Sequence, residues 1–270
     1  MTQMTGNMDD FGIDAASMTG PLEAKLKGAA QAGFAQVMLY AEDLLGHPDG
    51  VDAAVAKVCA SGLRVTALRS LRDYEGLDGA AHDFKMDVAK SLLTLCDAIH
   101  CKQLLVQASA HPGARNDAVS LAADLRKIAM LAIPKGIRVV YCASVDARCV
   151  TDFGKAWDLV CEADMPNLGL GLAADTVLEF IGQTPLDDLE MLDMDRLFLV
   201  QLSDFLGEPD KHPSGNTASA LCRVFPGEGL HRDLVASMVT RLHALGYRGD
   251  YSLDVHNRDY GLMPLQEVAQ

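Results

Sequence analysis

The chain of 270 residues lacks any apolar run that approaches the length of a membrane-spanning helix. Its first residues, MTQMTGNMDDFG, carry acidic side chains and no cationic segment followed by an apolar stretch, so no secretory signal is expected. Paired cysteine motifs are also missing, because the seven cysteines are scattered and no two form a CxxC pair. Neither a disulfide framework nor a zinc ribbon is expected, and the sequence predicts a reduced, cytoplasmic protein.

Basic residues are scarce: 23 Lys and Arg stand against 37 Asp and Glu, which gives a formal net charge of −14. An acidic surface repels phosphate backbones and anionic lipids, so nucleic acids and membranes are not expected partners. The expected partner is a small molecule, and a small anion would need a locally basic pocket. A homo-oligomer is left open by the composition.

Strand-like and helix-like patterns alternate along the chain, of which 49% is hydrophobic, enough for one large α/β domain or two small ones. Strands are expected at residues 12–17, 36–40, 63–68, 103–106, 137–141, 168–172, 197–202 and 251–255. Helices are expected at residues 22–32, 51–60, 81–99, 117–132, 152–163, 186–191 and 233–245, with a long irregular segment at 203–229.

This order of elements predicts a (β/α)8 TIM barrel, a single α/β domain over residues 1–270 with no linker or composition shift. A doubly wound open sheet is the alternative. It is weakened because SMTG, and no GxGxxG motif, follows the first strand. The chain after Asn257 is short, so the last helix is expected to be stunted or supplied by swapping or oligomerisation.

A barrel places its functional residues at the C-terminal ends of the strands. Arg69, Arg72 and Arg223 would bring guanidinium groups, which recognise carboxylates and phosphates, into an otherwise acidic protein. For Arg72, a surface ion pair with Asp73 or Glu75 is an equal alternative. The other polar residues at these positions are Tyr40, Glu42, Asp43, Glu75, Gln107, Cys142, Asp175, Gln201, Asp204, His212, Cys222, Glu228, Asp254 and His256.

Four of these residues can be weighed from the sequence alone. Gln201 follows FLV in a core strand, and its buried amide needs a partner, either a ligand or neighbouring backbone. Asp254, within YSLDVHN, is costly in a core strand unless it is paired or metal-bound. His256 shares that face, but simple exposure is expected for it. Cys142, at the end of GIRVVYC, is expected to be a small buried side chain, because no histidine next to it in sequence would lower its pKa.

Seven segments together resemble one protein family. They are GPLEAKLKGAAQAGFAQVMLY, GLRVTALRSLRDYEGL, IRVVYCASVD, ADMPNLGLGLAADT, RLFLVQLSD, CRVFPGEG and GYRGDYSLDVHNRD, and they cover nearly the whole chain. In this order and spacing they resemble the xylose-isomerase-like barrels, a superfamily of sugar phosphate isomerases and epimerases. Within it, the resemblance is strongest to the barrel domain of bacterial 3-dehydroshikimate dehydratases. It implies a TIM barrel and an enzyme of the lyase or isomerase type.

The resemblance also implies one divalent cation, Mg, Mn, Co or Zn. Its ligands would be a Glu after the fifth strand, an Asp after the sixth, a Gln or His after the seventh and a Glu after the eighth. Gln201 matches its position, and Asp254 supplies a shorter carboxylate. Cys142 replaces the first Glu, and Ala173 replaces the Asp. The implied metal ligands that remain are Gln201, Asp254 and Cys142.

This remaining ligand set is poor for a hard cation, which prefers several oxygen ligands. A thiolate would favour zinc, but Gln is a poor zinc ligand. We therefore expect the metal site to be emptied or rebuilt and the metal to be absent or altered. A two-residue shift of the alignment would instead make Asp175 the ligand after the sixth strand. Thr176 and Cys149 replace two further histidines of the family pattern.

The substrate side of the resemblance is better preserved, because Arg72 and Arg223 match arginines that face the substrate. The predicted catalytic residues are Asp254, as the base, with Arg72 and Arg223, and the predicted substrate-binding residues are Arg69, Glu75, Gln107 and Glu228. One hypothesis is an enzyme that removes a proton next to a carbonyl of a small polyhydroxylated carboxylate or sugar-like compound. The alternatives are a non-catalytic descendant that binds a small acid or a partner subunit, and a metal-free enzyme of altered reaction.

Overall fold

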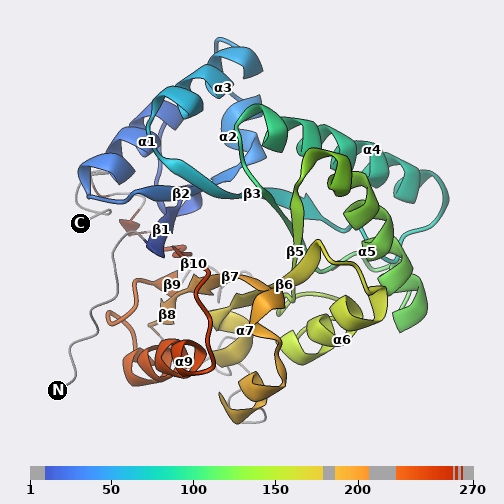
Figure 1. Ribbon diagram of the computed structural model, residues 1–270. Coiled ribbons are helices and arrows are strands. Elements are labelled where there is room, and N and C mark those ends of the chain that lie inside the picture. Colours follow the sequence, from blue (N-terminus) through green and yellow to red (C-terminus); the bar gives the residue numbers. More distant parts are fainter. Residues whose placement is uncertain (1–9, 179–185, 207–222, 258, 261–262, 264–270) are drawn as a thin grey trace.

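Eight parallel strands close into a barrel in the order β1-β10-β7-β6-β5-β4-β3-β2, and helices surround it (Figure 1). The computed structural model describes residues 10–178, 186–206, 223–257, 259–260 and 263. Every neighbouring pair in the barrel is parallel. The predicted TIM barrel is therefore confirmed, and the alternative of an open doubly wound sheet is wrong because the sheet closes between β1 and β10.

The strands and helices follow the predicted order. The barrel strands are β1 (Phe11–Asp14), β2 (Gln36–Tyr40), β3 (Arg64–Arg72), β4 (Gln103–Gln107), β5 (Arg138–Cys142), β6 (Leu168–Ala173), β7 (Leu197–Leu202) and β10 (Asp250–Leu253). The longer helices are α1 (Leu22–Gln31), α3 (Val51–Ala60), α4 (Gly79–Ala98), α5 (Ala118–Ala132), α6 (Phe153–Ala163) and α9 (Arg232–Ala244). No helix among the described residues is both long and apolar enough to cross a membrane.

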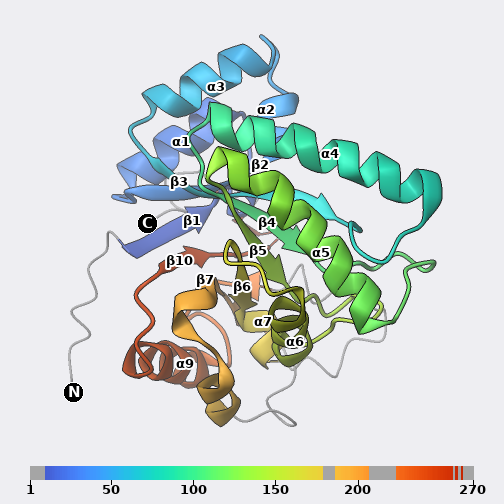
Figure 2. The same ribbon diagram turned by 45° about the vertical axis from the view of Figure 1, so that its right-hand side comes forward.

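Helix α5 shows how the sequence builds the outer layer. Asp117 caps its first turn by accepting a hydrogen bond from the backbone N–H of Ser120, at 2.8 Å. Leu121, Leu125 and Ile128 recur at helical spacing and are all buried against the barrel. Each such side chain contributes about 1.5–3 kcal/mol on burial. Helices α4 and α5 lie side by side on the same flank of the barrel in both views (Figure 2).

The barrel interior contains a small apolar layer of its own, because alternate residues of each strand point inward. Its members are Met38, Ala67, Leu105, Val140, Cys142, Phe198 and Leu199, of which the consecutive pair Phe198 and Leu199 departs from the alternation where the register of β7 against β6 shifts. The glycines of β6 make room for it. A Cβ atom on Gly171 would lie 2.2 Å from Sγ of Cys142 and 2.7 Å from Cγ1 of Val140. Gly171 is thus required by the larger side chains of β5, whereas a Cβ atom on Gly169 would lie 2.6 Å from the Phe198 ring of β7.

Several short elements were not predicted. Helices α2 (Ala41–Leu45) and α7 (Ala174–Leu178) begin directly where β2 and β6 end. Within the segment expected to be irregular, β8 (Asp204–Phe205) pairs antiparallel with β9 (Arg223–Val224) as a separate two-stranded sheet. The loop histidine His212, with Cys222, and most of the expected last helix lie outside the described residues.

Candidate functional site

Asp254 is the centre of a polar cluster at the C-terminal end of the barrel. Its side chain is 3% exposed and contacts four others. Oδ2 accepts hydrogen bonds from Nε2 of Gln201 at 3.1 Å and from Nη1 of Arg223 at 2.9 Å. Nη1 of Arg69 lies 3.3 Å from the same carboxylate, and Nε2 of His256 lies 3.1 Å from Oδ1. The cost of burying this carboxylate is thus offset by pairing. Pairing was one of the two alternatives expected for Asp254 from the sequence, and metal binding was the other.

The charge state of Asp254 follows from these neighbours. Burial alone would raise its pKa, but the guanidinium groups of Arg69 and Arg223, together with His256, hold the pKa of Asp254 well below its usual range. Asp254 is therefore ionised at neutral pH. A carboxylate held this strongly in its ionised form is a weak proton acceptor.

Arg223 links two carboxylates that follow the ends of different strands, β6 and β10. Its Nη1 contacts Asp254, and its Nη2 lies 2.9 Å from Oδ2 of Asp175 in the first turn of α7. A backbone hydrogen bond of 3.2 Å from its N–H to the carbonyl of His256 fixes β9 beside the end of β10. The Arg223 side chain is only 11% exposed, and its buried Nε has no hydrogen-bond partner.

Arg69 joins Asp254 to a third carboxylate, Asp14 at the end of β1. Nη1 of Arg69 lies 3.3 Å from Oδ2 of Asp14, and its guanidinium lies 5.3 Å from the centre of the Tyr40 ring, a cation–π contact. Complete burial, with the charge of Asp254 adding to it, raises the pKa of Asp14 to about 6, while Arg69 opposes the rise. Asp14 was not predicted from the sequence, although a carboxylate in the strand FGID is the same signal that singled out Asp254.

Five charged side chains thus form one alternating row, Asp14, Arg69, Asp254, Arg223 and Asp175, which we call the carboxylate–arginine cluster. Charges of opposite sign are neighbours throughout, so each buried carboxylate is paired. The structure brings together the predicted residues Arg69, Arg223, Asp254 and Gln201. Asp14 and His256 belong with them and were not predicted as site residues.

Cys142 lies next to this cluster. Its thiol donates a long hydrogen bond of 3.9 Å to Oε1 of Gln201, whose Nε2 in turn contacts Asp254. The three side chains that the family pattern implied as metal ligands are therefore neighbours. Burial raises the pKa of Cys142 to about 12, so the group is a neutral thiol at physiological pH. Neutral thiols are poor metal ligands and poor nucleophiles.

The donors at the barrel mouth do not fit a divalent cation. Among the described residues, no three His, Cys, Asp or Glu side chains lie close enough together to hold a metal ion. Asp254 and Asp175 are already bridged by the Arg223 guanidinium. Ala173 offers no donor, and the Thr176 hydroxyl points back to the Ala173 carbonyl at 2.7 Å. A cation placed here would face two guanidinium groups and a neutral thiol.

A second polar row at the strand ends contains Arg72. Its Nη2 forms an ion pair with Asp146, so its partner is neither Asp73 nor Glu75, the two that the sequence suggested. Ser144 donates to the other oxygen of Asp146, and Nε2 of Gln107 donates to the Ser144 hydroxyl at 2.9 Å. Arg72 and Gln107 are also paired across β3 and β4. Both are predicted site residues, and both lie in this row.

Glu75 lies elsewhere, in the layer between the barrel and the helices. Its Oε1 accepts hydrogen bonds from the backbone N–H of Ser109 at 2.6 Å and from the Tyr141 hydroxyl at 3.0 Å. Burial raises the pKa of Glu75 to about 7. Beside it, Asp73 accepts a hydrogen bond from the N–H of Ala110 at 2.8 Å. These contacts fasten the LRDYEGL loop to the loop after β4, and they keep Glu75 apart from the carboxylate–arginine cluster.

Glu228 is exposed and accepts a hydrogen bond from the Tyr260 hydroxyl. Its loop, FPGEG, is held by the buried Asp204 of β8, which accepts hydrogen bonds from the N–H groups of Gly229 at 3.2 Å and His231 at 2.9 Å. Substrate binding by Glu75 and Glu228 stays a prediction, since neither side chain joins the two polar rows.

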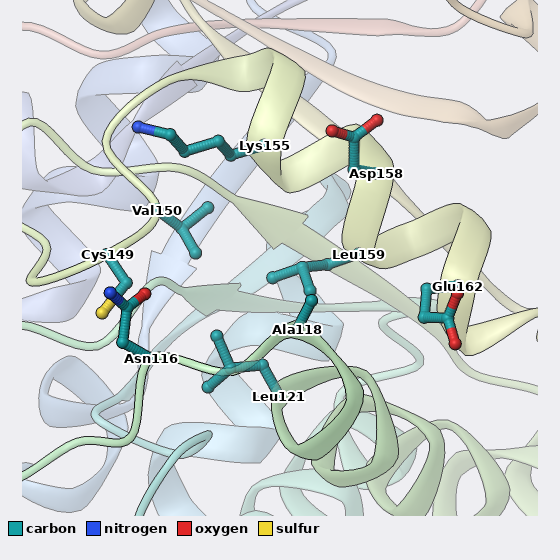
Figure 3. A pocket seen from close by; sticks show the side chains of 9 residues that line it. All are labelled: Asn116, Ala118, Leu121, Cys149, Val150, Lys155, Asp158, Leu159 and Glu162. Carbon is teal, nitrogen blue, oxygen red and sulfur yellow. The ribbon is translucent and has the colours of Figure 1, made fainter.

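A separate cleft of about 280 Å³ lies between α5 and α6 (Figure 3). Cys149 is at one end of it, with its thiol 3.7 Å from the carbonyl of Arg115. Val150 and Leu159 form part of its apolar wall, and Asp158 and Glu162 lie on the α6 side. None of the predicted site residues lines this cleft.

Comparison with known proteins places the barrel in a family. The family model described as xylose isomerase-like TIM barrel matches residues 26–270. The chain is 33% identical over 260 residues to a 3-dehydroshikimate dehydratase of Pseudomonas aeruginosa, and 30% identical over 258 residues to one of Pseudomonas putida. Each match covers 95% of this chain but 39% of the relative, so the chain spans well under half the length of these relatives.

Solved structures agree on the fold. A xylose isomerase-like TIM barrel/4-hydroxyphenylpyruvate dioxygenase fusion protein superposes with a TM-score of 0.86 at 27% identity, covering 96% of this chain and 40% of the other. The IOLI protein, solved with a zinc atom, superposes with a TM-score of 0.82 at 16% identity, covering 97% and 94%, and shows the fold alone. From the closed barrel and the family match over residues 26–270, the chain belongs to the xylose isomerase-like TIM barrel family.

Proposed function

We propose that the barrel mouth binds a small polyhydroxylated carboxylate or sugar-like carbonyl compound and removes a proton next to its carbonyl, as in the dehydration of 3-dehydroshikimate. The family metal site is emptied or rebuilt in this proposal. The observation that carries it is the carboxylate–arginine cluster at the C-terminal end of the barrel, where enzymes of this fold act. The relatives named 3-dehydroshikimate dehydratase support the choice of substrate.

The arginines are assigned the role of binding the negative charge of the substrate. Arg72 is 36% exposed and its partner Asp146 is 28% exposed, so a substrate carboxylate can take the place of Asp146 on the guanidinium. Arg69 and Arg223 lie deeper, where the charge that develops on a carbonyl oxygen during proton removal would be stabilised. Gln107 and Ser144, beside Arg72, supply groups that can bind substrate hydroxyls.

The proton is assigned to the Asp254–His256 pair, in which the imidazole of His256 takes it and the ionised carboxylate of Asp254, 3.1 Å away, holds the imidazole in place. The Asp254 side chain is 3% exposed and His256 is 30% exposed, so the imidazole lies between the buried carboxylate and the open end of the barrel. The base takes the proton from the carbon next to the carbonyl, and the electron pair moves onto the carbonyl oxygen. The enolate then expels the β-hydroxyl group, which leaves as water after accepting a proton.

The second candidate is a non-catalytic barrel that binds a related acid or a partner subunit. It is favoured by Cys142, Ala173 and Thr176, which supply no ionised or basic group at positions where the family pattern has one. The retained arginines fit binding as well as turnover. The assignment to the cytoplasm, with a small molecule and neither nucleic acid nor membrane as partner, belongs to both candidates.

Turnover separates the two candidates. We expect the purified chain to convert 3-dehydroshikimate to its aromatic dehydration product, and Asp254→Asn to lower kcat at least about 100-fold. Arg241→Met, on the outer surface, is the matched control and should keep wild-type kinetics. Thermal stabilisation by 3-dehydroshikimate without any turnover would support the binding protein, and neither turnover nor stabilisation would reject 3-dehydroshikimate as substrate or ligand of this chain.

A further inference from the structure

We propose that Arg223 is the resident cation of this site: its guanidinium, bridging Asp175 and Asp254, takes the place that a divalent cation holds in the family pattern. The inference rests on the proposed function in one respect, because it takes the carboxylate–arginine cluster as the active site. It goes further by stating what the rebuilt site uses instead of a metal.

The geometry is that of a bridge. The two terminal nitrogens of Arg223 each lie 2.9 Å from a carboxylate oxygen, one from Asp175 at the end of β6 and one from Asp254 at the end of β10. These are two of the three strand ends from which the family pattern takes carboxylate ligands, and the third carries Cys142 in this chain. A planar guanidinium with two donors at its fork suits this arrangement better than an ammonium group.

The burial of these side chains makes a cation necessary. Asp254, Asp175 and Arg223 have side chains that are 3%, 9% and 11% exposed. Two carboxylates this close in a poorly solvated site would repel each other without a positive group between them. Arg223 fills that role, and Arg69 on the other side of Asp254 adds a second positive charge. A divalent cation at the same carboxylates would be repelled by both guanidinium groups.

Position in the chain agrees with this role. The backbone of Arg223 is held by the carbonyl of His256, directly after β10, so the side chain enters the barrel mouth from a segment anchored to the strand that carries Asp254. Gln201 donates to Asp254, and its oxygen faces the thiol of Cys142. In this orientation the Gln201 amide completes the hydrogen bonding of Asp254 and presents no oxygen to a metal.

The first test uses the wild-type chain, purified without chelator, with metal content and thermal unfolding as readouts. We expect no stoichiometric metal. The midpoint temperature of thermal unfolding should change by at most about 1 °C with EDTA or with added Mn, Co or Zn. About one metal ion per chain, lost together with stability in EDTA, would overturn the inference.

The second test removes the bridge. Arg223→Met leaves Asp175 and Asp254 without their cation, so we expect a lower midpoint that added Mn or Zn raises by about 3 °C or more, an effect that EDTA abolishes. Arg241→Met is the matched control, since Arg241 also bridges two carboxylates, Asp187 and Glu190, but on the surface. It should gain no response to metal. An Arg223→Met chain with the wild-type midpoint and no response would overturn the inference.

A third variant keeps the inference testable if Arg223→Met does not fold. Arg223→Lys keeps one positive charge at the carboxylates, so we expect a folded chain that does not respond to metal, whereas stoichiometric Mn binding by this variant would overturn the inference. None of these measurements uses a substrate. Absence of turnover would therefore count against the proposed function and leave the bridge standing, whereas stoichiometric metal in the wild-type chain or in Arg223→Lys would count against the bridge whether or not the chain turns over substrate.

Discussion

The Tyr141 hydroxyl donates a buried hydrogen bond of 3.0 Å to Glu75 on the helix-facing side of the barrel, one residue away from Cys142, which faces inward. Two neighbouring residues of β5 therefore serve two different layers. Glu75 comes from the loop after β3, and its Oε2 is buried without a hydrogen-bond partner. The carboxyl group is thus held in a site that suits its neutral form.

This arrangement predicts a pH dependence of stability. Burial raises the pKa of Glu75 from 4.5 to about 7, so the folded chain binds this proton more tightly than the unfolded chain. The stabilisation from protonated Glu75 is complete below pH 4.5 and is lost as the pH rises to 7. The free energy of unfolding should fall by about 3 kcal/mol over this range. Glu75→Gln should remove this part of the slope, measured by urea unfolding from pH 5 to pH 8. The exposed Glu228→Gln should keep the wild-type slope, and an unchanged slope in Glu75→Gln would contradict the prediction.

Arg72 gives a second prediction, which concerns ligand binding. Its ion pair with Asp146 is partly exposed, so Arg72→Ala should cost less than about 1 kcal/mol of folding free energy. If Arg72 holds a substrate carboxylate, the same variant should weaken binding of 3-dehydroshikimate about 10- to 100-fold. Calorimetry would measure the affinity, with Arg241→Met as the control. An unchanged affinity would remove Arg72 from the site.

The FPGEG loop gives a third prediction. Asp204 is fully buried, and its carboxylate accepts four backbone hydrogen bonds, from Phe205 and Gly227 as well as from Gly229 and His231. Hydrogen bonds to a charged acceptor are strong, and their loss leaves buried N–H groups unpaired. Asp204→Ala should lower the free energy of unfolding by about 2–4 kcal/mol. A loss below 0.5 kcal/mol, measured by urea unfolding, would show that the loop does not depend on this carboxylate.

Much of the fold could be predicted because the signals are local. The strand at residues 36–40 and the helix at 51–60 were predicted at their observed bounds. The spacing of apolar residues indicates each element, and Gly62 marks the end of the helix. The two-residue strands β8 and β9 were missed because so short an element shows no periodicity. Helices α2 and α7, of five residues each, were missed for the same reason.

The candidate site was predicted less completely because its contacts join distant parts of the sequence. The strand-end rule selected Arg69, Gln201 and Asp254, and they do meet. It could not tell that Arg72 pairs with Asp146, which is 74 positions away. It also could not tell on which side of the strand the Glu75 side chain would turn, because that depends on the hydroxyl of Tyr141 and the backbone of Ser109.

The last prediction tests the tight contact between β5 and β6. A Cβ atom on Gly171 would lie 2.2 Å from Sγ of Cys142 and 2.7 Å from Cγ1 of Val140, far inside normal contact distances. Gly171→Ala should therefore destabilise the chain by about 2 kcal/mol or more, as overpacking of a core does. The double variant Gly171→Ala with Cys142→Ala removes the closer clash and should recover about 1 kcal/mol relative to the sum of the single variants. Additive effects of the two substitutions, measured by urea unfolding, would show that the side chain of Cys142 does not set the need for glycine in β6.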